Sequence, residues 1–90
     1  MKRIIITVVG KDKVGIIAMV CSYLADQKVN ILDISQTIVQ GFFNMMMVVD
    51  MQNSVKEFEV LAADLEKAGE SMGCVIKAQR EEIFDQMHRV

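Results

Sequence analysis

The apolar patterns along the chain predict an α+β domain with a four-stranded antiparallel sheet and two helices on one of its faces. Four short runs rich in β-branched or alternating residues favour strands, and two longer runs with apolar residues three or four positions apart favour helices. The chain has 90 residues, of which 52% are apolar and 24% charged, which is typical of one globular domain. We expect a single domain over residues 1–90, with its core at 2–80 and a short helix at 81–90.

The first half of the chain predicts a strand, a helix and two further strands. Residues 2–9 are mainly apolar and β-branched and stop at a glycine, and residues 14–28 have apolar side chains at helical spacing. Residues 30–40 alternate apolar and polar side chains, which is typical of a strand with one exposed face. After a glycine turn, residues 42–51 form a strand with apolar side chains on both faces.

The second half predicts a helix, a strand and a terminal helix. The SVKE segment, Ser54–Glu57, has the spacing of a capping box, in which both side chains accept hydrogen bonds from N–H groups of the first helical turn. We therefore expect a long helix to begin there and to end at Gly73. Residues 74–79 alternate as a strand does, and the segment at 81–90 has one apolar helical face.

This βαββαβ order is the ferredoxin-like arrangement. Right-handed crossovers place the first and third strands in the centre of the sheet and the other two at its edges. Both central strands are apolar on two faces, whereas two helices can cover only one face. Either the terminal helix or a second subunit must cover the other, and we expect a homodimer.

Composition argues against several classes of protein. A net charge of −2 does not favour nucleic acid binding, which depends on Lys and Arg contacts to phosphate. The longest apolar runs are strand-sized, far below the roughly 18 residues that a membrane span needs, and no leader-like segment precedes them. Cys21 and Cys74 lack metal-binding or disulfide spacing and are expected as small buried side chains. We expect a cytoplasmic protein without a metal, cofactor, membrane or nucleic acid partner.

The GKDKVGI segment, Gly10–Ile16, connects the first strand to the first helix. A P-loop requires Lys and then Ser or Thr after its second glycine, and here Ile16 and Ile17 hold those positions. The loop also lacks a thiolate or imidazole pair for a metal, and it has no arginine to hold a phosphoryl group as an acylphosphatase-like loop would. Nucleotide hydrolysis is therefore excluded, and the loop offers no metal site.

The same loop could bind a small carboxylate. The first turn of a helix presents unpaired N–H groups and a partial positive charge. Gly15 would allow a ligand to approach the backbone closely. Asp12 could bind the amino group of such a ligand, or it could simply cap the helix.

No other pattern indicates catalysis. His88, the only histidine, is expected near a helix C-terminus, where its charge is favourable. The eight methionines are typical of flexible packing in a core or an interface. An RNA-recognition motif would need aromatic side chains on both central strands, and the IIITVV run has none. We therefore expect a binding protein rather than an enzyme.

These segments resemble the ACT-domain family of small regulatory, amino-acid-binding modules. The resemblance covers residues 2 to about 80 and follows the order of the parts: Asp12 and Gly15 in the first loop, an apolar helix, Asn30-Ile31 opening the second strand, and Val49-Asp50 ending the third. The terminal REEIFDQMHRV segment is similar to the tail of the stand-alone bacterial ACT proteins, which look related to regulators of the glycine cleavage system.

The resemblance implies a dimer or higher oligomer, with an amino acid between the first loop and helix start of one subunit and the second strand of a neighbour. It nominates Asp12, Val14, Gly15 and Ile16 on one side and Asn30, Ile31 and Leu32 on the other. Many members have proline where Val14 stands, and without an attached enzyme or DNA-binding domain any signal would pass to a partner protein. The alternatives are an interaction or dimerisation module that binds no ligand and, third, a small hydrolase.

Overall fold

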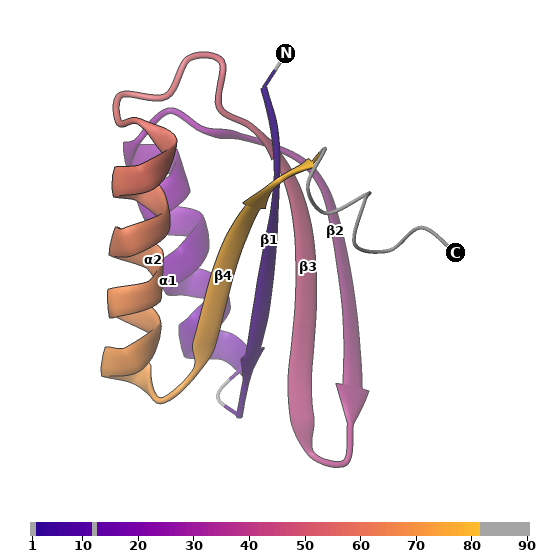
Figure 1. Ribbon diagram of the computed structural model, residues 1–90. Helices are drawn as coiled ribbons and strands as arrows, with labels where there is room; N and C mark the ends of the chain where they lie inside the picture. The colour runs from indigo at the N-terminus through magenta and orange to yellow at the C-terminus, as the bar shows by residue number, and fades with distance from the viewer. Residues whose placement is uncertain (1, 12, 82–90) are drawn as a thin grey trace.

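The structure is a computed structural model, which describes residues 2–11 and 13–81, with the side chain of Lys13 left out. Figure 1 shows two helices side by side on one face of a sheet. The elements follow in the order β1 (Arg3–Gly10), α1 (Lys13–Asp26), β2 (Asn30–Val39), β3 (Phe42–Asp50), α2 (Phe58–Met72) and β4 (Val75–Arg80). The predicted ferredoxin-like βαββαβ fold is confirmed, whereas nearly all of the predicted terminal helix lies outside the described residues.

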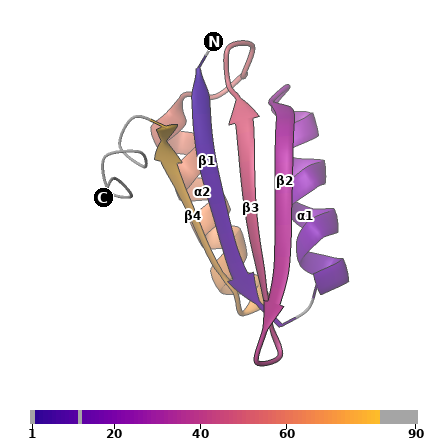
Figure 2. The same ribbon diagram turned by 90° about the vertical axis from the view of Figure 1, so that its right-hand side faces the viewer.

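The strands are arranged in the order β2-β3-β1-β4, and every neighbouring pair is antiparallel. β1 and β3 therefore occupy the centre of the sheet, as predicted. Figure 2 shows the sheet from the side opposite to the helices, which lie behind the strands. Neither helix in the described part of the chain is long and apolar enough to cross a membrane.

The strand register determines which residues lie at the same end of the sheet. Asp50 pairs with Arg3 on one side and with Asn30 on the other, whereas Gly10 pairs with Phe43. β2 thus begins at the end of the sheet where β1 begins, because α1 returns the chain to that end. A bulge between Ile31 and Asp33 leaves one extra residue early in β2.

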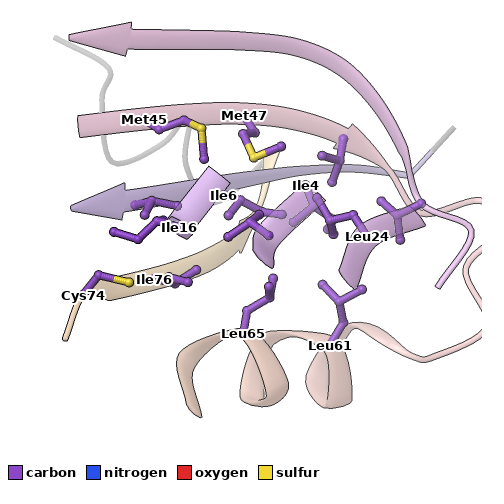
Figure 3. Close-up of a cluster of buried hydrophobic side chains, with 14 of the residues drawn as sticks. Ile4, Ile6, Ile16, Leu24, Met45, Met47, Leu61, Leu65, Cys74 and Ile76 are labelled. Atoms are coloured by element: carbon purple, nitrogen blue, oxygen red, sulfur yellow. The ribbon is translucent and has the colours of Figure 1, made fainter. Parts of the chain in front are cut away.

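The core lies between the helices and the sheet. Alternate residues of β1 and β3 point toward the helices, while Leu61 and Leu65 of α2 point toward the sheet (Figure 3). The fully buried large side chains are Ile6, Val8, Ile16, Val20, Leu24, Met47, Val49, Leu61, Leu65 and Ile76. Cys74 is buried, as predicted, and this burial raises the pKa of its thiol; Cys21 is partly buried against the core.

The predicted capping box is wrong. α2 begins at Phe58, and its N-cap residue Glu57 makes no side-chain capping bond. The Ser54 hydroxyl donates to the Lys56 carbonyl at 2.7 Å and accepts from the Lys56 N–H at 3.2 Å, so it closes a local turn. The Val55 N–H donates to the carbonyl of Gln27 at 2.9 Å, which ties this segment to the end of α1 instead of to a helical turn.

The other end of α2 is as predicted. Gly73 follows the helix with φ of 72°, a left-handed conformation that glycine adopts without steric cost. The Gly73 N–H donates to the Glu70 carbonyl, and the Cys74 N–H donates to the Gly69 carbonyl at 2.8 Å. These bonds satisfy carbonyls of the last turn and direct the chain into β4.

Candidate ligand-binding site

The first half of the predicted site is the connection between β1 and α1. Asp12 lies outside the described residues. Val14 is 79% exposed, Gly15 is partly buried, and Ile16 is fully buried in the core. The loop therefore presents Val14 to solvent, whereas Ile16 could contact a ligand only through its backbone.

Gly10 has a packing role that explains it without a ligand. A Cβ atom built on Gly10 would lie 2.6 Å from Cδ1 of Ile16 and 2.7 Å from Cβ of Cys74. Real Cβ atoms do not approach other atoms so closely, so any larger residue would displace α1 or the start of β4. The absence of a side chain at Gly10 therefore allows β1, α1 and the start of β4 to pack closely together.

Lys11 contributes a contact at this loop that no sequence pattern indicates. Its ammonium lies 5.4 Å from the ring centroid of Phe42, the first residue of β3, which is within the range of a cation–π contact. The contact joins the first loop to the β2–β3 hairpin. It holds one cationic group beside the loop that the sequence nominates for a carboxylate.

The second half of the site is the start of β2. Asn30 is exposed, Ile31 packs partly against the core, and Leu32 is the extra residue at the bulge and is exposed. No described strand pairs with the outer edge of β2. The backbone of this segment is therefore accessible from outside the sheet.

The two halves lie at opposite ends of the sheet. Asn30 is level with Arg3, whereas the first loop follows Gly10 at the far end of the eight-residue strand β1. With a rise of roughly 3.3 Å per residue, the start of β2 and the first loop are separated by about 23 Å along the strands. One chain therefore does not bring the nominated residues together.

A cleft of about 650 Å³ opens at the end of the sheet where β1 begins. It lies between the start of β1, the β3–α2 connection, the start of α2 and the end of β4. No sequence pattern indicates it, because its lining residues come from four separate segments. It is therefore distinct from the first loop, which is at the opposite end of β1.

Two ion pairs lie at this cleft. Nη2 of Arg80 lies 2.9 Å from Oε1 of Glu59, and Nη1 of Arg3 lies 3.4 Å from Oε1 of Glu81. Hydrogen bonds from its own backbone N–H and from Arg80 lower the pKa of the Glu59 carboxyl. The Arg80 guanidinium also lies over the ring of Phe58, 4.4 Å from the centroid.

A second polar cluster joins the two helices. Asp64 of α2 accepts hydrogen bonds from Nζ of Lys56 at 2.7 Å and from the Tyr23 hydroxyl of α1 at 2.5 Å. These bonds lower the pKa of Asp64, while burial and the neighbouring carboxylate raise the pKa of Tyr23. The cluster fixes α1 against α2, and Lys56 also lies 5.5 Å from the Tyr23 ring centroid. Within residues 2–11 and 13–81, no three His, Cys, Asp or Glu side chains are grouped to hold a metal ion.

Comparison with known proteins places the chain in a family. Its sequence matches the ACT domain over residues 2–79. The chain belongs to the ACT-domain family. It is 57% identical to a UPF0237 protein of Bifidobacterium longum over 90 residues, which is 100% of both chains. It is 46% identical to a UPF0237 protein of Methanocaldococcus jannaschii, again over 90 residues and 100% of both chains.

Two solved structures have the same fold. An ACT domain protein from Streptococcus pneumoniae has a TM-score of 0.81 and 40% identity, covering 93% of this chain and 94% of that one. A chain provisionally described as a glycine cleavage system transcriptional repressor has a TM-score of 0.73 and 20% identity, covering 88% of this chain and 45% of the other. The second likeness shows the fold alone. The resemblance to the ACT family is confirmed, and this chain is a small module of a regulatory domain family.

Proposed function

We propose that this ACT module forms a homodimer, binds an amino acid or a similar small carboxylate between its subunits, and signals the bound state to a partner protein. The observation that carries the proposal is the separation of the nominated residues. The first loop and Asn30–Leu32 lie at opposite ends of one sheet, so a site that uses both would need a second chain.

The edge of β2 is suited to such a dimer. Eight consecutive residues, Leu32–Val39, are exposed, including four large apolar side chains, and long apolar edge strands tend to pair with another strand. Two β2 strands that pair in antiparallel fashion about a two-fold axis place the start of one beside the end of the other. The end of β2 is level with Gly10, because Ile38 and Gly10 both pair with Phe43. Asn30–Leu32 of the neighbour would thereby reach the level of the first loop.

Ligand binding would act through linkage. A ligand held by both subunits stabilises the dimer by its greater affinity for the assembled state. The assembled state would present a different surface to a partner protein than the separate chains do. One subunit would contribute Asp12, Val14, Gly15 and the backbone of Ile16 to the site. The other subunit would contribute Asn30, Ile31 and Leu32.

A second candidate function is an interaction or dimerisation module without a ligand. The burial of Ile16 and the close packing of Gly10 favour it, because core packing alone accounts for both residues. In this case the fold and the β2 edge would be retained while the first loop would have no occupant.

Thermal unfolding against a panel of amino acids at millimolar concentration separates the two functions. We expect one or a few amino acids to raise the melting temperature of the wild-type chain by several degrees, since ligands stabilise the state they bind. Gly15→Trp should abolish the rise by filling the loop. The matched control is Ala63→Trp, which adds the same side chain at an exposed position of α2.

The outcomes are distinct. A dimer by sedimentation equilibrium that responds to no amino acid would favour the ligand-free module. A chain that is monomeric at micromolar concentration, with and without ligand, would contradict both functions. A ligand response retained in Gly15→Trp would contradict the assignment of the first loop.

A further inference from the structure

The cleft at the start of β1 combines apolar lining residues with charged walls. Ile4 and Met51 line it but are only 4% and 6% exposed, so the apolar surface that a ligand could cover comes mainly from Val55, which also lines the cleft and is 67% exposed. The charged lining side chains are Lys2, Arg3, Lys56, Arg80, Glu57, Glu59 and Glu81. Lys56 is already bonded to Asp64, and the other three cations and the three glutamates of the lining balance in number. The volume of about 650 Å³ falls within the range of small-molecule pockets.

Arg80 is the group in this cleft best placed to bind an anion. Its guanidinium lies over the ring of Phe58, 4.4 Å from the centroid, and this cation–π contact restricts the position of the guanidinium. An arginine side chain has five N–H donors, and the hydrogen bond to Glu59 uses one nitrogen of the fork. Arg80 is therefore oriented toward a carboxylate before any ligand arrives.

The carboxylate that Arg80 now contacts is readily displaced. The side chains of Arg80 and Glu59 are 44% and 69% exposed, and ion pairs exposed to this degree contribute little to stability. Breaking this ion pair would therefore cost little free energy. A ligand carboxylate that also buries apolar surface would gain more free energy than is lost with the pair. Glu59 thus acts as an internal competitor that marks where an incoming carboxylate binds.

We propose that this cleft binds a small carboxylate with an aliphatic body. The carboxylate replaces that of Glu59 on Arg80, and the aliphatic part lies against Val55, the exposed apolar side chain of the lining. This site is separate from the first loop and is contained within one chain, so it depends neither on the dimer nor on the proposed amino-acid site. A ligand without an apolar part, such as inorganic phosphate, would gain nothing from contact with Val55 and would bind more weakly.

Titration of the full chain followed by backbone amide chemical shifts tests the site. The probe is 4-methylpentanoate, with 4-methylpentanamide as its uncharged counterpart and inorganic phosphate as an anion without an apolar body. We expect saturable shifts for residues 51–59 and 79–81 with the carboxylate, and none with the amide. Shifts confined to residues 11–16, equal binding of the amide, or tighter binding of phosphate would overturn the proposal.

Two variants with opposite expected effects make the test sharper. Arg80→Met should weaken binding of 4-methylpentanoate about tenfold or more, because it removes a charge-assisted hydrogen bond. Glu59→Gln should strengthen binding, because it removes the competitor while leaving Arg80 in place. If the ion pair had only a structural role, the two substitutions would not change the affinity for 4-methylpentanoate in opposite directions.

Lys77→Met is the matched control. It removes one cation from the same strand. Side chains alternate between the two faces of a strand, and Ile76 points into the core, so Lys77 points to the opposite face. Binding should change less than twofold in this variant. Unchanged affinity in a folded Arg80→Met, or weaker binding in Glu59→Gln, would overturn the proposal; the second variant decides the question if the first does not fold.

Discussion

The two edge strands of the sheet differ in length, polarity and support. β4 has six residues, and its Arg80 is held to α2 by Glu59 and Phe58. β2 has ten residues and exposes large apolar side chains along most of its length. Short, charged edges resist pairing with other chains, whereas long apolar edges favour it. The comparison indicates that β4 closes the domain at one side and that β2 is the side at which a second chain can add.

The largest expected difference between the edges is in stability. Ile76 of β4 is 1% exposed, whereas Ile34 of β2 is 39% exposed. Ile76→Ala should lower the free energy of unfolding by about 2–5 kcal/mol, because it removes buried contacts and leaves a cavity. Ile34→Ala should cost much less. Urea denaturation of both variants measures the difference, and equal losses would contradict the view that only β4 is built into the core.

The next effect concerns association. Ile38→Glu places a charge at the β2 edge and should weaken the dimer about tenfold or more, as measured by sedimentation equilibrium. Val75→Glu is the matched control on β4, since both side chains are exposed, at 66% and 57%. A dimer broken by Met46→Glu but not by Ile38→Glu would instead locate the interface on the uncovered face of the sheet, where Met46 is exposed.

A smaller loss of stability is expected at the cluster that joins the two helices. Tyr23→Phe removes the hydroxyl that donates to Asp64 but retains the ring beside Lys56. The melting temperature should fall by less than in Ile76→Ala, because a single partly exposed hydrogen bond is lost. A fall as large as that of Ile76→Ala would show that this cluster, not the apolar core, dominates helix docking.

The smallest expected effect is a pH dependence at the β4 edge. The pKa of Glu59 is lowered in the folded chain, first by its own backbone N–H and then by Arg80. The folded state therefore favours the ionised carboxyl, and its contribution is present above the unfolded pKa and lost as the pH falls through the folded value. Glu59→Gln should lose slightly less stability than wild type between about pH 5 and pH 3 in urea denaturation. Identical pH profiles would show that this pair does not contribute.

Much of the fold follows from local patterns in the sequence. The apolar residues on both faces of β1 and β3 indicate central strands, and the single glycine after α2 marks its end. The start of α2 does not follow in the same way. The SVKE spacing is a property of four residues, whereas the bond from Val55 to Gln27 depends on how α1 and the β3–α2 connection meet.

The candidate site was less predictable than the fold. Residues at the first loop and at Asn30–Leu32 can be nominated from the sequence, but only the strand register shows that they lie at opposite ends of the sheet. The burial of Ile16 and the contact of Lys11 with Phe42 likewise depend on tertiary packing. The cleft beside Arg80 had no sequence signal, because Ile4, Met51, Phe58 and Arg80 meet only after the sheet has formed.

In the proposed dimer, the length of β1 would make the response depend on how many copies of the chain a cell contains. If each amino-acid site takes one half from either end of two different sheets, a solitary chain has no complete site and cannot respond to the amino acid at any dose. The response then requires enough copies of the chain for pairs to form, so the abundance of the protein sets the threshold of detection together with the level of the amino acid. In that case, a change in expression alone would shift the amino-acid concentration at which the protein responds.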